Sequence, residues 1–251
     1  MRVLKNRRLL EEANKNKETG DKIALEKYGQ PLAKLRKKER AKIVSDYLEG
    51  KIVPYGWLRP KKFNIRNISE NVIWQYHVFN NRYGDYFIDN NFMIKNRKVA
   101  QSFRDKYWER EKKSMLKYTN DVEYINEVIE SSRKKEDEFI VEGDKWVEWA
   151  SGLKDKKLYF LKVMAYVNVR YDKPSLDYPV YLFMTKKKDI IGLNEMYVLL
   201  LLDTFGKDIE FYTTTKSFVL AYLNNEVVGA ITTFTLDLNF IEYIEKIIKG
   251  G

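Results

Sequence analysis

Residues 194–234 read NEMYVLLLLDTFGKDIEFYTTTKSFVLAYLNNEVVGAITTF. The apolar run from Met196 to Leu202 predicts a buried helix, and the residues that follow it alternate between apolar and polar. Three strands are therefore expected at 209–213, 217–223 and 227–234. Asn224 and Asn225 separate the last two strands, which is typical of a tight hairpin turn. A helix followed by an antiparallel meander indicates the α+β class.

Further helices and strands are expected on both sides of this meander. The apolar spacing predicts helices over 1–49, 97–118, 122–132 and 240–248, a β-hairpin near 74–94, and strands over 158–170 and 180–185. The first helical region is expected to break at Thr19-Gly20-Asp21, because Gly favours turns and Asp can cap a new helix. The aromatic residues of 146–149 are expected to fill the core of a sheet.

A charged run over 133–138 marks the predicted boundary between two parts of the chain. Residues 1–135 are expected to form a basic, mainly helical part that contains the hairpin near 74–94. Residues 136–251 are expected to form an antiparallel β-sheet flanked by helices. The predicted fold class is therefore α+β, and the chain is long enough to bury one large core or two smaller ones.

The formal net charge of +10 is concentrated near the N-terminus. Residues 1–100 hold 23 basic and 11 acidic side chains, whereas residues 101–251 hold 23 and 25. Charge of one sign in one region creates a field that attracts polyanions or anionic surfaces. This asymmetry is the feature of the sequence that indicates a partner.

Two basic stretches with interleaved aromatic residues stand out within this region. Cations bind phosphates and flat aromatic rings stack on bases, so the combination favours a nucleic-acid groove. The candidate binding residues are Lys34, Arg36, Lys37, Lys38, Arg40, Tyr55, Trp57, Arg59, Lys61, Lys62 and Arg66. The residues from Lys34 to Arg40 are assigned to phosphates, and Tyr55 and Trp57 are assigned to base stacking.

The same residues fit other interpretations. Basic residues surround the predicted helix instead of lining one side, which also fits a solvated charged helix or a surface for an acidic protein. Trp57 and Phe63 also fit a hydrophobic anchor that fixes the connector after the helix to the core.

The residue types present exclude several kinds of catalytic site. The chain has no Cys and a single His, His77, so neither a Cys nucleophile nor a structural zinc site is expected. His77 lies in a predicted strand, where a packed or surface histidine is the ordinary case. The sequence also has no Gly-rich phosphate loop before a Lys and a Ser or Thr. No cofactor is expected, and the sequence favours a protein without enzymatic activity.

Metal-dependent catalysis by carboxylates is compatible with this composition, because Mg²⁺ prefers oxygen ligands. Asp208 and Glu210 lie on the same face of a predicted strand, and Lys207 and Lys216 lie nearby in the sequence. The alternative is that both acids belong to the solvated face of that strand.

Targeting features are also missing from the sequence. No run approaches the length of a membrane-spanning helix, and the N-terminus has no apolar segment typical of a secretory signal. With the absence of Cys, this predicts a cytoplasmic protein that does not associate with membranes. The abundance of Lys, Asn, Ile, Tyr and Phe is typical of AT-rich genomes, including those of phages.

The order of Asn194, Tyr197, a Leu-rich helix and three short strands resembles the closing part of a bacterial sliding-clamp domain. The resemblance covers residues 194–234 and includes no catalytic motif. A complete clamp needs repeated copies of this unit, and the sequence shows no second copy, so the resemblance implies no function.

These observations lead to one main hypothesis and two alternatives. The main hypothesis is a non-enzymatic nucleic-acid-binding protein, such as an accessory factor of a phage or mobile element. The first alternative is a protein-binding inhibitor or adaptor of a nucleic-acid-processing complex. The second is a divalent-metal-dependent nuclease that uses Asp208 and Glu210.

Overall fold

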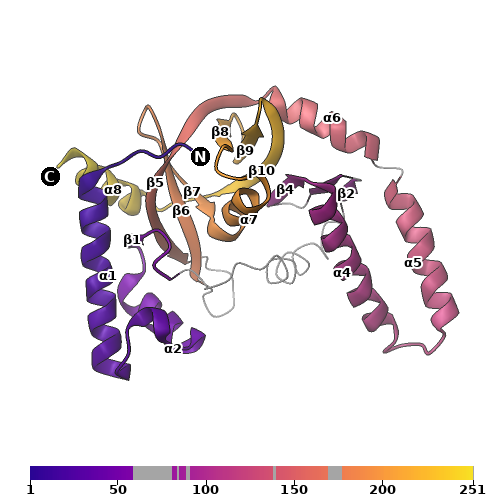
Figure 1. Ribbon diagram of the computed structural model, residues 1–251, viewed down its shortest axis with the longest axis horizontal. Helices are drawn as coiled ribbons and strands as arrows, with labels where there is room; N and C mark the ends of the chain where they lie inside the picture. Colours follow the sequence, from indigo (N-terminus) through magenta and orange to yellow (C-terminus); the bar gives the residue numbers. More distant parts are fainter. Residues whose placement is uncertain (59–80, 84, 89–90, 138–139, 169–176, 251) are drawn as a thin grey trace. The chain divides into compact units, whose positions relative to one another are not determined.

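A computed structural model describes residues 1–58, 81–83, 85–88, 91–137, 140–168 and 177–250. It confirms the α+β class, with helices packed against antiparallel strands (Figure 1). The chain divides into two compact units, each built from separate stretches of sequence. Unit 1 contains Met1–Lys62, Lys156–Val198 and Thr233–Gly251, and unit 2 contains Phe63–Asp155 and Leu199–Thr232.

This division differs from the predicted boundary near residue 135, because the two ends of the chain pack together in unit 1. Helix α1 (Arg7–Tyr28) contacts helix α8 (Leu238–Lys249). The Tyr243 hydroxyl donates a hydrogen bond to Glu12 Oε1 at 3.2 Å. Such contacts depend on docking between residues far apart in sequence, which local periodicity does not report.

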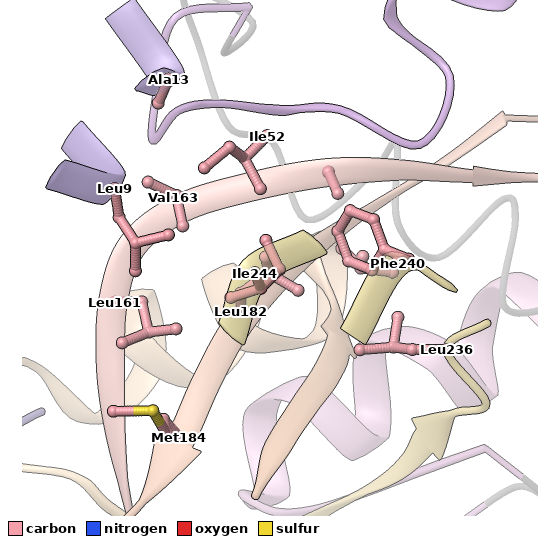
Figure 2. Close-up of a cluster of buried hydrophobic side chains, with 12 residues drawn as sticks. Leu9, Ala13, Ile52, Leu161, Val163, Leu182, Met184, Leu236, Phe240 and Ile244 are labelled. Carbon is pink, nitrogen blue, oxygen red and sulfur yellow. The ribbon is translucent and has the colours of Figure 1, made fainter. Parts of the chain in front are cut away.

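Unit 1 is built on an antiparallel sheet in the order β1 (Ile52–Pro54), β5 (Lys154–Asn168), β6 (Asp177–Thr185) and β7 (Ile190–Asn194). The last residues of β10 (Glu226–Phe234) pair with β7. Helices α1 and α8 cover one face of this sheet. Figure 2 shows the core between them, where Leu9 of α1 and Ile244 of α8 pack with Leu161 and Leu182 of the sheet.

Unit 2 contains a second antiparallel set of strands. Their order is β2 (Asn81–Tyr83), β3 (Tyr86–Ile88), β4 (Phe92–Lys95), β10, β9 (Phe218–Leu223) and β8 (Glu210–Thr214). Among its described residues, the helices assigned wholly to this unit are α4 (Arg97–Met115), α5 (Val122–Asp137) and α6 (Ile140–Ser151). Helix α7 (Glu195–Phe205) begins in unit 1 and ends in unit 2. A core that includes Tyr86, Ala150 and Leu220 joins α6 to the strands.

The predicted meander is confirmed, since α7 is followed by β8, β9 and β10. The helices predicted over 97–118, 122–132 and 240–248 correspond to α4, α5 and α8. The aromatic stretch 146–149 differs from the prediction, because it lies in helix α6 and Trp149 is 51% exposed. Strand β7 was not predicted. The part of the predicted hairpin before residue 81 lies outside the described residues.

Helix α1 runs unbroken through the predicted turn at Gly20, so that prediction was wrong. A Cβ atom added at Gly20 would lie 2.8 Å from Cη2 of Trp57 and 3.2 Å from Cδ1 of Leu48. The absence of a side chain at Gly20 therefore lets α1 approach Trp57 and Leu48 closely. Gly20 does not end a helix.

We expect Gly20→Ala to lower the free energy of unfolding by about 1 kcal/mol. Alanine favours a helix over glycine by about 1 kcal/mol, but inserting a methyl into a tight contact costs about 1–3 kcal/mol. Asn14→Ala, at an exposed site of the same helix, is the matched control and should be neutral or slightly stabilising. Urea denaturation measures both variants, and a stabilised Gly20→Ala protein would contradict the contact.

Candidate nucleic-acid interface

The candidate interface begins with a buried apolar scaffold in unit 1. Residues 32–48 form a 3₁₀ turn, η1 (Leu32–Lys34), a short helix, α2 (Lys37–Ile43), and a π-helical turn, η2 (Val44–Leu48). The apolar side chains that anchor these turns are buried, and they are Leu32, Leu35, Ile43, Val44 and Leu48. The Leu32 N–H donates a hydrogen bond to Asp21 Oδ1 of α1 at 3.0 Å, which fixes the entry to η1.

The basic residues of this region lie on its outer surface. We call them the basic segment, which comprises Lys34, Arg36, Lys37, Lys38, Arg40 and Lys42. Lys34, Arg36, Lys38 and Lys42 are exposed and Arg40 is half-buried, while the side chain of Lys37 lies outside what the structure describes. The buried apolar side chains hold the backbone, and the exposed cations Lys34, Arg36, Lys38 and Lys42 face solvent.

The acidic residue inside the basic segment is engaged by the backbone. Glu39 Oε2 accepts a hydrogen bond from the Arg36 N–H at 3.1 Å, as an acid in the first turn of a helix often does. Within the described part of the chain, no carboxylate lies within ion-pair distance of Lys34, Arg36, Lys38, Arg40 or Lys42. The described cations of the segment are therefore not held in ion pairs.

Two cations of the neighbouring helix α1 form ion pairs within that helix. In α1, Arg7 Nε lies 2.7 Å from Glu11 Oε1, and Lys22 Nζ lies 4.0 Å from Glu26 Oε1. Both pairs have the i, i+4 spacing that lets opposite charges meet along a helix. These two cations of α1 are thus paired with acids, whereas none of the described cations of the basic segment is.

Tyr55 does not lie open for stacking on a base. Its half-buried ring meets the edges of Phe160 and Tyr181, with ring centroids 5.3 and 5.2 Å apart. The Tyr55 N–H also donates to the Lys162 carbonyl at 3.2 Å. These contacts attach the residue to strands β5 and β6 and favour an anchoring role.

Trp57 is also half-buried, and its ring approaches Gly20 of α1. Leu32 and Leu48, which flank the basic segment in sequence, also approach Gly20, so the indole and these leucines pack at the same position on α1. Of the two interpretations made from sequence, this geometry favours the hydrophobic anchor. The remaining candidates lie outside the described residues, and they are Arg59, Lys61, Lys62 and Arg66; so do Phe63 and His77.

An aromatic residue that the sequence did not indicate lies next to the basic segment. Tyr47 of η2 is 37% exposed, and the Lys27 ammonium donates to its hydroxyl at 2.9 Å and lies 4.7 Å from its ring centroid. The hydrogen bond to Tyr47 raises the pKa of Lys27. Tyr47 follows Ile43 by four residues, which is the spacing of residues on one buried face of a helix. The sequence therefore did not predict that Tyr47 is exposed.

The proposed metal-binding acids belong to unit 2. Asp208 is exposed before β8, and Glu210 Oε2 accepts a hydrogen bond from the Tyr212 hydroxyl at 2.9 Å. Ile209 and Phe211 are buried, as expected if the acids occupy the solvated face of this strand. Among the described residues, no group of three or more His, Cys, Asp and Glu side chains is arranged to hold a metal ion.

No protein-family model, curated protein or solved structure matches the chain. The resemblance of residues 194–234 to part of a sliding-clamp domain is therefore supported by no solved structure. None of the helices in the described residues has the length and apolar character needed to cross a membrane.

Proposed function

We propose that the protein binds nucleic acid through the basic segment and that it has no catalytic role in this interaction. The observation that supports the proposal is a group of five surface cations between Lys34 and Lys42 without carboxylate partners in the described residues. Phosphates spaced along a nucleic acid supply the missing counter-charges. A cytoplasmic location, inferred from the sequence, would bring the protein and such a partner together.

The geometry changes the role assigned to the aromatic residues. Tyr55 and Trp57 stabilise the surface that carries the cations, because both rings contact residues of unit 1. Binding would then depend mainly on phosphate contacts, which position a protein on nucleic acid without reading sequence. We therefore propose weak sequence preference.

Affinity for a 20-base-pair DNA duplex of random sequence is expected to fall steeply with salt. If the five described cations each neutralise one phosphate, they contribute about −4 to −5 to the slope of log affinity against log salt. Fluorescence anisotropy between 50 and 300 mM salt measures this slope. Binding that is absent at low salt, or that does not change with salt, would contradict the proposal.

A pull-down from source-cell lysate, with and without nuclease, separates nucleic acid from a protein partner. Under the proposal, captured material disappears after nuclease treatment. A protein that remains bound after nuclease treatment would favour the inhibitor or adaptor alternative.

A further inference from the structure

The turn between β6 and β7 is a second cationic feature of unit 1. Residues 185–189 read Thr-Lys-Lys-Lys-Asp, and all three lysines are exposed. No carboxylate of the described residues lies within ion-pair distance of these lysines. The nearby Asp189 is paired instead with Lys156 of β5, with Nζ and Oδ2 3.1 Å apart.

The turn is held in one shape by its own hydrogen bonds. The Lys188 N–H donates to the Thr185 carbonyl and the Thr185 N–H donates to the Asp189 carbonyl, both at 3.0 Å. The Thr185 hydroxyl donates to Asp189 Oδ2 at 2.9 Å. This hydrogen bond and the contact with Lys156 lower the pKa of Asp189, so its carboxylate stays ionised and braces the turn. The lysines are therefore presented from a fixed backbone.

Lys188 occupies a backbone conformation that lysine rarely adopts. Its φ of 72° lies in the left-handed region, where Gly or Asn is the usual residue in hairpin turns. A branched or long side chain is less favourable there than glycine. Lys188 thus adopts this unusual conformation beside two other exposed lysines.

The register of the sheet places this turn near one end of the paired part of β5, and the end of η2, which follows the basic segment in the chain, near the other. Thr185 pairs with Leu158, whereas Glu49, just after η2, bridges to Tyr166. On the neighbouring strand β6 the same stretch runs from Thr185 to Pro179, which is six residue steps or roughly 20 Å, because β5 is bulged between Phe160 and Met164. A small phosphate ligand cannot span that length, but a nucleic acid can.

We propose that Lys186, Lys187 and Lys188 form a second phosphate-binding site, and that the partner is a nucleic acid long enough to contact both this turn and the basic segment. The inference rests on the proposed function. It adds a minimum length to the ligand and assigns a role to the β6–β7 turn.

The test compares the wild-type protein with K186Q/K187Q/K188Q on two DNA probes. A 20-base-pair duplex is about 70 Å long and spans the two sites, whereas a hairpin with a four-base-pair stem, about 14 Å long, does not. We expect the variant to lose at least ~10-fold in affinity for the duplex, with its salt slope reduced by about 3. Affinity for the short hairpin should change less than twofold.

The matched control is K98Q/K145Q/K207Q, which removes the same charge from three exposed lysines of unit 2 and should leave duplex affinity nearly unchanged. If wild-type protein binds neither probe, the proposed function itself fails. If it binds the duplex and the turn variant binds equally well, only the second site is overturned. Equal losses of affinity for the duplex and the hairpin would also overturn the second site. A variant that loses affinity for polyglutamate, an acidic polymer without phosphates, but not for DNA would overturn it as well.

Lys188→Gly separates a role of the charge from a role in folding. Glycine fits the left-handed position, so we expect the melting temperature to rise by about 2 °C while duplex affinity falls several-fold. Affinity that is unchanged in this variant would contradict the use of Lys188 in binding.

Discussion

Replacing Lys34, Arg36 and Lys38 with glutamate is expected to lower the affinity for a 20-base-pair duplex by at least ~100-fold at low salt. The substitutions remove three phosphate contacts and add three negative charges at the same surface. They should not unfold the protein, because all three side chains are exposed and acids are favourable near the N-terminus of a helix such as α2. Anisotropy titration measures the affinity, and circular dichroism checks the fold.

The control for this experiment is K98E/K145E/K207E, which changes the net charge equally at exposed lysines of unit 2. A general electrostatic attraction would weaken similarly in both variants. The basic segment is the binding surface only if its own reversal has the much larger effect, so equal losses would count against it.

Ile244→Ala is expected to lower the free energy of unfolding by about 3 kcal/mol. Ile244 is fully buried in α8 and packs with Leu9 of α1 and Leu182 of β6. Alanine has the higher helix propensity, so the loss would come from the cavity and not from the helix itself. Thermal or urea denaturation provides the measurement.

Leu238→Ala is the matched substitution in the same helix. Leu238 is 75% exposed, so the change should stay within about 0.5 kcal/mol of the wild-type protein. Equal stability of the two variants would contradict the packing of α8 in unit 1. It would also contradict the assignment of the two chain ends to one unit.

Elements with strong local periodicity were predictable from sequence. The run from Met196 to Leu202 and the alternation after it correspond to α7 and β8–β10. The role of Gly20 was predicted wrongly because it depends on the close approach of Trp57, which is distant from α1 in the sequence. Helix α6 was missed because aromatic residues such as Trp149 are also common in strands.

The candidate site was predictable to the extent that it depends on composition. The crowding of cations from Lys34 to Arg40 is visible in the sequence, and the structure places the described ones at the surface. The contacts that bury Tyr55 come from Phe160 and Tyr181, so no local pattern indicated them. The three lysines of 186–188, in contrast, follow a predicted strand directly, and that position was an available signal for an exposed turn.

The most direct test of nucleic-acid binding by the basic segment is amide hydrogen exchange, measured with and without the 20-base-pair duplex. Direct contact predicts slower exchange over residues 34–42 when DNA is bound, and little change over β8 and β9 in unit 2. Duplex binding that leaves exchange over 34–42 unchanged would contradict this interface.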